Sequence, residues 1–385
     1  MTGPTTEPRP TALHDEHVTL GATLVPFAGW TMPLRYTSDV AEHTAVRTAA
    51  GLFDLSHMGE ISVAGPGAAA FLDYALVGAL SALRVWGARY TMICAPDGGV
   101  LDDLIVYRLA DTQYMVVANA ANYDVVLGAL RERTDGFDVT IGDDSADTAL
   151  IAVQGPTALA IVEALDGLDI VSDDTTAATL KYYACLPLRF AGVDGLLART
   201  GYTGEDGFEF FVPAGTAVAL WRALLAAGAD HGLVPAGLAA RDSLRLEAGM
   251  PLYGHELDLT TNPQDAGLGR VVRLDKTDAD GNPLDFVGRG PLDSRAHAPG
   301  ARRLVGLQGL GKRAARAGYL VLATPDGPTI GTVTSGAPSP TLGYPIAMAY
   351  VTPERSAEGT DLFVDVRGRP EPFRIVPLPF YRRPK

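Results

Sequence analysis

The chain has 385 residues, of which 47% are hydrophobic and 20% charged, and its 31 basic and 45 acidic side chains leave a formal net charge of −14. This balance argues against a general nucleic-acid binder, because such proteins need basic stripes that displace counterions from phosphates. The composition is that of a globular protein, and the length is enough for two or three domains.

The cysteines and the N-terminus argue against several further classes of protein. Cys94 and Cys185 lie far apart with no metal-binding spacing around them, so we predict neither a disulfide framework nor a cysteine-ligated zinc site. No stretch approaches the roughly 20 apolar residues that cross a bilayer, and no signal-peptide pattern opens the chain. We therefore expect a cytoplasmic protein that binds no membrane, with residues 1–12 as a loose tail.

Helical signals begin after this tail. Ser38 is suited to cap a helix over residues 39–50, and Gly51 marks its end. A second helix is predicted at 66–77, where a proline opens the run and a glycine follows its end. Three further helices are predicted at 157–165, 216–227 and 236–248.

Short runs rich in β-branched and aromatic residues alternate with these helices. They lie at 61–63, 88–94, 100–109, 113–119, 149–154 and 208–212. The order lacks the regular strand-helix-strand spacing of a doubly wound sheet, so the pattern predicts an α+β fold.

The pattern changes around residues 296–303, where a Pro-Gly pair interrupts any apolar periodicity. Beyond this point glycine and proline separate short strands, and helical patterns disappear. We predict one domain over 13–297 and a C-terminal β-barrel over 298–385.

Two adjacent carboxylates stand in the stretch GGVLDDLIVY. In a strand, Asp103 shares one face with Tyr107, whereas Asp102 shares the other face with apolar neighbours. Both faces are mostly apolar, so each carboxylate must either be hydrogen-bonded to a partner or serve in a functional site. Two interpretations remain: Asp103 serves a site, or the pair closes the preceding Gly98-Gly99 turn through backbone amides.

A second stretch, RTGYTGEDGFEFF, runs from a glycine-rich loop into a strand. Alternation places Glu209 on one face with Phe211, and Phe208 and Phe210 on the other. A carboxylate beside an aromatic ring is either a specific hydrogen-bond acceptor or a solvated acid on an edge strand.

The helix predicted at 236–248 carries Arg241 and Arg245 one turn apart. Two guanidinium groups on one face can hold a carboxylate or a phosphate. The alternative is local pairing, for example of Arg245 with Asp242.

One apparent catalytic pair fails on geometry. Ser56 and His57 are adjacent, so in a strand they point to opposite faces and cannot act as nucleophile and base.

Several ordered stretches together resemble the tetrahydrofolate-dependent aminomethyltransferase family, whose best-known member is the T-protein of the glycine cleavage system. The resemblance runs from about residue 13 to the C-terminus with the spacing preserved. It is carried by FAGWTMPLRY (27–36), LFDLSHMGE (52–60), GGVLDDLIVY (98–107), VANAAN (117–122), AVQGP (152–156), RTGYTGEDGFE (199–209), GLAARDSLRLEAG (237–249), PLYGHELD (251–258) and TVTSGAPSPTLG (332–343).

The resemblance implies a fold of three subdomains around a central folate cavity, the first two interleaved and the third a C-terminal barrel. It implies transfer of an aminomethyl group from the dihydrolipoyl arm of H-protein to tetrahydrofolate, with release of ammonia and no metal. The expected partners are H-protein, the other glycine cleavage components and folate as co-substrate. Such a transfer needs orientation and a carboxylate near developing positive charge, but no protein nucleophile.

The resemblance also implies roles for single residues. Asp103 matches the family's catalytic acid, Glu209 its pterin-binding carboxylate, and Arg241 the arginine beside the active site. Tyr90, Tyr107, Asn119 and Tyr202 match residues that line the folate pocket, and Arg382 approaches the folate tail or the carrier.

One departure concerns the donor. Arg270 stands where many relatives have tryptophan, so the substrate side of the cavity differs from theirs. Two alternatives stay open: a folate-dependent demethylase of a small methylated amine or methoxy compound, and a folate-binding protein without transferase activity.

A basic segment interrupts the acidic chain. Residues 301–318 contain five basic side chains and no acid, and we expect folate-tail or carrier contacts there or, alternatively, a solvated strand face. The five are Arg302, Arg303, Lys312, Arg313 and Arg316.

Overall fold

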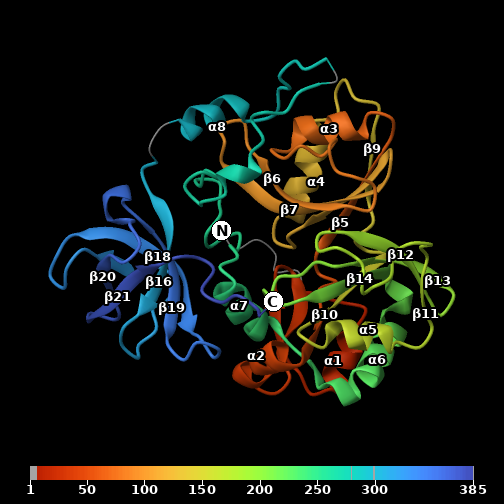
Figure 1. The fold of residues 1–385 in the computed structure, drawn as a ribbon, viewed down its shortest axis with the longest axis horizontal. Helices are drawn as coiled ribbons and strands as arrows, with labels where there is room; N and C mark the ends of the chain where they lie inside the picture. The colour runs from red at the N-terminus through yellow and green to blue at the C-terminus, as the bar shows by residue number, and fades with distance from the viewer. Residues whose placement is uncertain (1–6, 279, 298–299, 385) are drawn as a thin grey trace. The chain divides into compact units, whose positions relative to one another are not determined.

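A computed structural model describes residues 7–278, 280–297 and 300–384, and Figure 1 shows its ribbon. The chain forms two units, each assembled from separate segments. The first comprises residues 1–68, 82–89 and 105–242, and the second residues 69–81, 90–104 and 243–385. The predicted boundary at 297/298 is not the division between these units, and residue 298 lies outside the described residues.

The helices are short and lie mostly before the barrel. The α-helices are α1 (His14–Thr19), α2 (Asp39–Thr48), α3 (Ala68–Ala75), α4 (Tyr123–Glu132), α5 (Ala158–Glu163), α6 (Ala217–Ala227), α7 (Leu238–Glu247) and α8 (Arg289–Ala296). The 3-10 turns are η1 (Ala214–Thr216), η2 (Ala229–His231), η3 (Gly269–Val271) and η4 (Pro353–Arg355).

A seven-stranded sheet organises the first unit. Its order is β11 (Leu168–Ile170), β12 (Cys185–Phe190), β13 (Val193–Ala198), β14 (Gly207–Pro213), β10 (Thr148–Gln154), β4 (Ala50–Asp54) and β15 (Leu233–Pro235). Helices α5 and α6 cover one face, as Figure 1 shows, and Trp221 of α6 lies in the same buried cluster as Phe208 and Phe210 of β14. This cluster is the core of the unit because these rings remove large apolar areas from water.

A second sheet carries the Asp-Asp stretch. Its order is β6 (Ala88–Cys94), β7 (Val100–Ala110), β8 (Gln113–Ala118), β5 (Gly59–Ala64) and β9 (Thr140–Asp143). Strand β7 begins with residues of the second unit and continues into the first. Burial alternates along it from Val100 to Val106, as predicted for a strand with two different faces.

The prediction that residues 1–12 form a loose tail is wrong for part of this segment. Residues 1–6 lie outside the described part, but β1 (Arg9–Pro10) pairs with β3 (Trp30–Arg35), which also pairs with β2 (Thr23–Phe27). Buried Thr11 donates to Oδ2 of Asp54 at 2.7 Å. Residues 9–11 are therefore held by strand pairing and a buried hydrogen bond, which the polar, proline-containing sequence did not reveal.

The C-terminal strands close into a barrel, as predicted. Its order is β16 (Arg303–Gly309), β19 (Pro345–Val351), β18 (Thr329–Pro338), β17 (Leu320–Leu322), β20 (Asp361–Asp365) and β21 (Pro370–Val376). Leu307, Val321, Val333 and Phe373 fill its interior. Closure pairs every strand on both sides and leaves no open edge.

The predicted α+β class is confirmed, and most predicted elements exist with shifted ends. Ser38 caps α2 by accepting a hydrogen bond from the backbone N–H of Ala41 at 3.2 Å. The helix ends at Thr48 rather than near Gly51, because the chain enters β4 at Ala50. Within the described residues, no helix is long and apolar enough to span a membrane.

Candidate functional site

A buried carboxylate lies at the centre of the candidate site in the first unit. Glu209 of β14 is 7% exposed. Its Oε2 accepts hydrogen bonds from the hydroxyl of Thr200 and from the hydroxyl of Tyr107 on β7, the latter at 3.4 Å. The two hydroxyl oxygens are themselves 3.1 Å apart. Both bonds reach the same oxygen, so Oε1 is used by neither.

The strand pattern explains why this acid lies on its face. Phe208 and Phe210 enter the apolar core, so alternation turns Glu209 and Phe211 to the opposite face. The cross-strand neighbours of Glu209 are Ala152 and Ala198, whose small side chains leave room around the carboxylate. The ring of Phe211 meets that of Tyr107 edge-on, with centroids 5.5 Å apart. The predicted pairing of faces on β14 is thus confirmed.

Burial dominates the electrostatics of this acid. It raises the pKa of Glu209 above the ordinary value, although the Thr200 bond, the charge of Arg241 and the Tyr107 bond act in the opposite direction. The same burial, together with the charge of Glu209, raises the pKa of Tyr107. Tyr107 therefore remains a hydrogen-bond donor, and Glu209 is an acceptor positioned for a ligand that brings its own N–H groups.

Arg241 of α7 belongs to the same site. Its guanidinium carbon lies 4.7 Å from the ring centre of Tyr202, a cation–π contact. Burial lowers the pKa of Arg241, while the charges of Tyr202 and Glu209 counter this effect. Arg241, Tyr202 and Glu209 thus form one electrostatic group.

Arg245, one turn further along α7, contacts a different set of residues. Its Nη1 pairs with Oε2 of Glu256 at 2.9 Å, and both side chains are almost fully buried. Its Nη2 donates to Oγ of Ser335 on β18 at 2.8 Å. Arg245 therefore holds the carboxylate of Glu256, a partner that the sequence did not indicate.

Asp103 accepts a hydrogen bond within the second unit. The hydroxyl of Tyr90 on β6 donates to its Oδ2 at 3.0 Å, and the carboxylate is half-buried. The pKa of nearby Tyr253 is raised by burial and by the charges of Asp102, Asp258 and Asp103. In the Gly98-Gly99 turn, the carboxylate that accepts from Gly99 N–H, at 3.0 Å, belongs to Asp97. The alternative role of the Asp102–Asp103 pair as the closure of this turn therefore loses its main support.

The other predicted residues have separate surroundings. Asn119 follows β8, is half-buried, and its carbonyl accepts from the N–H of Asn122 at 2.9 Å. Arg382 is exposed near the C-terminal end, and Arg270 is exposed on η3.

Two neighbours of Arg241 and Glu209 were not among the site residues that the sequence predicted. Thr200 lies in the RTGYTGEDGFEFF motif, but a threonine hydroxyl gives little signal in sequence. His57 is 4% exposed. Its pKa is lowered to about 4 by burial and then by the charge of Arg241. It is therefore neutral near pH 7 and lies within electrostatic reach of the site.

The basic segment at 301–318 is largely engaged within its own unit. Arg313 pairs with Glu371 at 2.8 Å, and Arg316 donates to the carbonyl of Gly336 at 2.7 Å. Arg303 and Lys312 are exposed. In the part of the chain that the structure describes, no group of three or more His, Cys, Asp or Glu side chains has metal-binding geometry.

Comparison with known proteins adds independent information. Residues 13–276 match the family profile of the GCVT N-terminal domain, and residues 302–382 that of the glycine cleavage T-protein C-terminal barrel domain. The aminomethyltransferase of Saccharopolyspora erythraea is 58% identical over 376 residues, covering 98% of this chain and 99% of that protein. The aminomethyltransferase of Moorella thermoacetica is 47% identical over 377 residues, covering 97% and 98%. The crystal structure of glycine cleavage system aminomethyltransferase T from Bartonella henselae superimposes with a TM-score of 0.86 at 35% identity, covering 98% of this chain and 99% of that one.

Proposed function

Because the chain belongs to the glycine cleavage T-protein family and is an aminomethyltransferase, we propose that it transfers the methylene carbon of an S-aminomethyl-dihydrolipoyl arm of H-protein to tetrahydrofolate. Ammonia is released, and the enzyme works with the other components of glycine cleavage. The observation that carries the folate assignment is the buried Glu209 carboxylate with its Thr200 and Tyr107 donors.

Glu209 fits the ring of a folate. The 2-amino group and the N3–H of a pterin form a pair of adjacent donors, and a carboxylate is their bidentate acceptor. Tyr107 and Thr200 orient that carboxylate, while Arg241 on Tyr202 supplies an aromatic and cationic wall. We assign Asn119 to the same pocket and Arg382 to the folate tail or the carrier, as expectations that follow from family membership.

Asp103 is the proposed catalytic acid. In the overall transfer the methylene carbon loses its bonds to sulfur and to the amine nitrogen and gains two bonds to folate nitrogens. The two protons that leave those nitrogens go to the dihydrolipoyl sulfur, which becomes a thiol, and to the departing amino group, which leaves as ammonia. A cationic carbon develops on this path, and a half-buried carboxylate stabilises it and orients the attacking nitrogen. The Tyr90 hydroxyl bonded to Oδ2 fixes the orientation of Asp103.

The first experiment separates chemistry from binding. Purified Asp103→Asn is compared with the unaltered enzyme in methylenetetrahydrofolate formation from H-protein with an aminomethylated lipoyl arm. We expect kcat to fall by about 100-fold or more, with nearly unchanged folate affinity. Asp111→Asn, an exposed acid just beyond the same strand, is the matched control. Full activity of Asp103→Asn contradicts the assigned role, and absence of turnover with the carrier in the unaltered enzyme contradicts the donor.

The second experiment addresses recognition of the pterin. Glu209→Ala removes a charged acceptor, so we expect tetrahydrofolate to bind about 10- to 150-fold more weakly. Calorimetric titration measures the affinity, and Glu163→Ala on the exposed end of α5 is the control. Unchanged affinity in Glu209→Ala refutes the pterin contact and leaves the role of Asp103 to the first experiment.

A further inference from the structure

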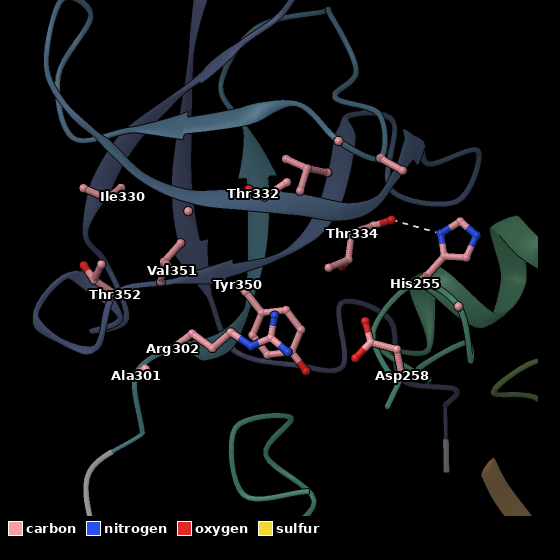
Figure 2. Close-up of a pocket in the computed structure, with 15 residues that line it drawn as sticks. His255, Asp258, Ala301, Arg302, Ile330, Thr332, Thr334, Tyr350, Val351 and Thr352 are labelled. Atoms are coloured by element: carbon pink, nitrogen blue, oxygen red, sulfur yellow. Dashed lines mark hydrogen bonds between the residues drawn. The ribbon is translucent and has the colours of Figure 1, made fainter. Parts of the chain in front are cut away.

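A second pocket lies on the outside of the barrel, within the second unit. Its volume is about 460 Å³. Figure 2 shows Arg302 and Tyr350 on one side, His255 and Asp258 on the other, and Ile330 and Val351 along the barrel wall. None of these residues is among those described above around Glu209 or around Asp103.

Arg302 presents a fixed positive charge to this pocket. Its guanidinium carbon lies 4.2 Å from the ring centre of Tyr350, so the group is held flat on the ring. Its Nη2 donates to Oγ1 of Thr261 at 2.9 Å and to the carbonyl of Thr260 at 3.3 Å. These bonds use one nitrogen of a fork that has three.

Asp258 presents a fixed negative charge. Its Oδ1 accepts three hydrogen bonds, from the N–H and the hydroxyl of Thr260 and from the hydroxyl of Thr261, each at 2.8 Å. Burial acts to raise the pKa of Asp258, but these bonds and the charge of Arg302 outweigh it and lower the pKa. The acid is therefore ionised near pH 7, and none of the three bonds uses Oδ2.

The two charges share Thr261 as a support, yet among the described residues they form no ion pair with one another. Figure 2 shows the guanidinium and the carboxylate on opposite sides of the floor of the pocket. A cation alone is repelled by Arg302, and an anion alone is repelled by Asp258. A molecule with both charges close together satisfies both groups.

We propose that this pocket binds a free α-amino acid, whose ammonium group donates to Oδ2 of Asp258 and whose carboxylate accepts from Nη1 of Arg302. His255 lines the same side of the pocket as Asp258, and its ring is fixed there by Nδ1, which donates to the carbonyl of Thr334 at 3.0 Å. The half-buried side chain of Ile330 on the barrel wall receives the side chain of the amino acid. This inference does not depend on the proposed transfer reaction.

Calorimetric titration of the full chain with glycine and L-leucine tests binding, with isoamylamine and isovalerate as probes that carry only one of the two charges. Each charged hydrogen bond that is lost weakens binding by more than about tenfold. We therefore expect at least one of the two amino acids to bind. Isoamylamine and isovalerate should each bind more weakly than that amino acid by about tenfold or more. Equal binding of isovalerate, or no binding of either amino acid, overturns the proposal. This comparison uses the unaltered protein and does not depend on the folding of a variant.

Variants then locate the binding. Asp258→Asn keeps the Oδ1 acceptor for Thr260 and Thr261 and removes the charge, and it should lose more than about tenfold in affinity. Arg374→Gln, which removes an arginine from an exposed barrel ion pair with Asp361, is the control and should bind as the unaltered chain does. Glu209→Ala should also bind normally, which separates this pocket from the folate site. Unchanged affinity in Asp258→Asn overturns the proposal.

Methyl NMR gives a readout of position. The methyl signals of Ile330 should shift on addition of the amino acid, whereas those of Ile151 in the core of the first unit should not. Shifts confined to the first unit overturn the proposed location.

Discussion

Arg245 provides the sharpest test of the packing in the second unit. Replacement by methionine keeps most of the volume of the side chain but removes the guanidinium from Glu256 and Ser335. The side chain of Arg245 is 1% exposed and that of Glu256 is 0% exposed. Water therefore cannot replace the lost partner without opening the structure.

The magnitude follows from this burial. Glu256 keeps one hydrogen bond to its Oε2, from the backbone N–H of Leu252 at 3.0 Å, but it loses its counter-charge. Removal of one partner from a buried ion pair costs about 3–5 kcal/mol. The carbonyl of Met250 and the hydroxyl of Ser335 lose a donor as well. We expect Arg245→Met to lower the free energy of unfolding by an amount in this range.

The assay is urea unfolding followed by tryptophan fluorescence and by far-UV circular dichroism. The double variant Arg245→Met with Glu256→Leu should recover much of the loss, because it leaves no buried charge without a partner. Arg374→Gln, at an exposed pair, should leave the unfolding midpoint unchanged. The reasoning is refuted if Arg245→Met lowers the free energy of unfolding by less than about 1 kcal/mol. It is also refuted if the double variant is less stable than both single variants.

Two further predictions concern buried acids. Tyr107→Phe removes one donor to Glu209 and should weaken tetrahydrofolate binding by about tenfold or less, measured by calorimetric titration, with the secondary structure unchanged; a loss as large as that of Glu209→Ala contradicts a merely orienting role. Burial and the charges of Asp143 and Asp144 raise the pKa of Glu60 well above the ordinary value. The folded chain therefore holds this proton to higher pH than the unfolded chain does, and stability falls as pH rises above the ordinary carboxyl value. Glu60→Gln removes this dependence, so its gain in melting temperature over the unaltered chain should be larger at pH 8 than at pH 5, and an equal gain at both contradicts the assignment.

Local rules explain the elements that could be predicted. The strand β6 has the predicted ends, Ala88 and Cys94, because an unbroken β-rich run is bounded by turn residues. The helix α4 was missed because Gly128 interrupts its pattern. The hairpin of β12 and β13 was missed because Pro187 lies inside one of its strands, where proline argues against a strand.

Long-range partners explain what could not be predicted in the site. Glu209 and Thr200 are near in sequence, but Tyr107 reaches them across a separation of 102 and 93 residues. Arg241 and Arg245 share one helix pattern, yet one contacts Tyr202 and the other Glu256 and Ser335. No periodicity distinguishes these outcomes, because they depend on which elements pack around each turn of the helix.

The sequence by itself determined the alternating faces of β7 and β14, the barrel after the Pro-Gly region and the family to which the chain belongs. These features follow from backbone periodicity and from ordered motifs, which are local properties of a chain. Only the tertiary structure decided which charges are paired, which acid holds its proton, and that Arg302 and Asp258 face one another without a pair. These outcomes depend on burial and on distances between segments far apart in sequence, and the net charge of −14 contains no information about either.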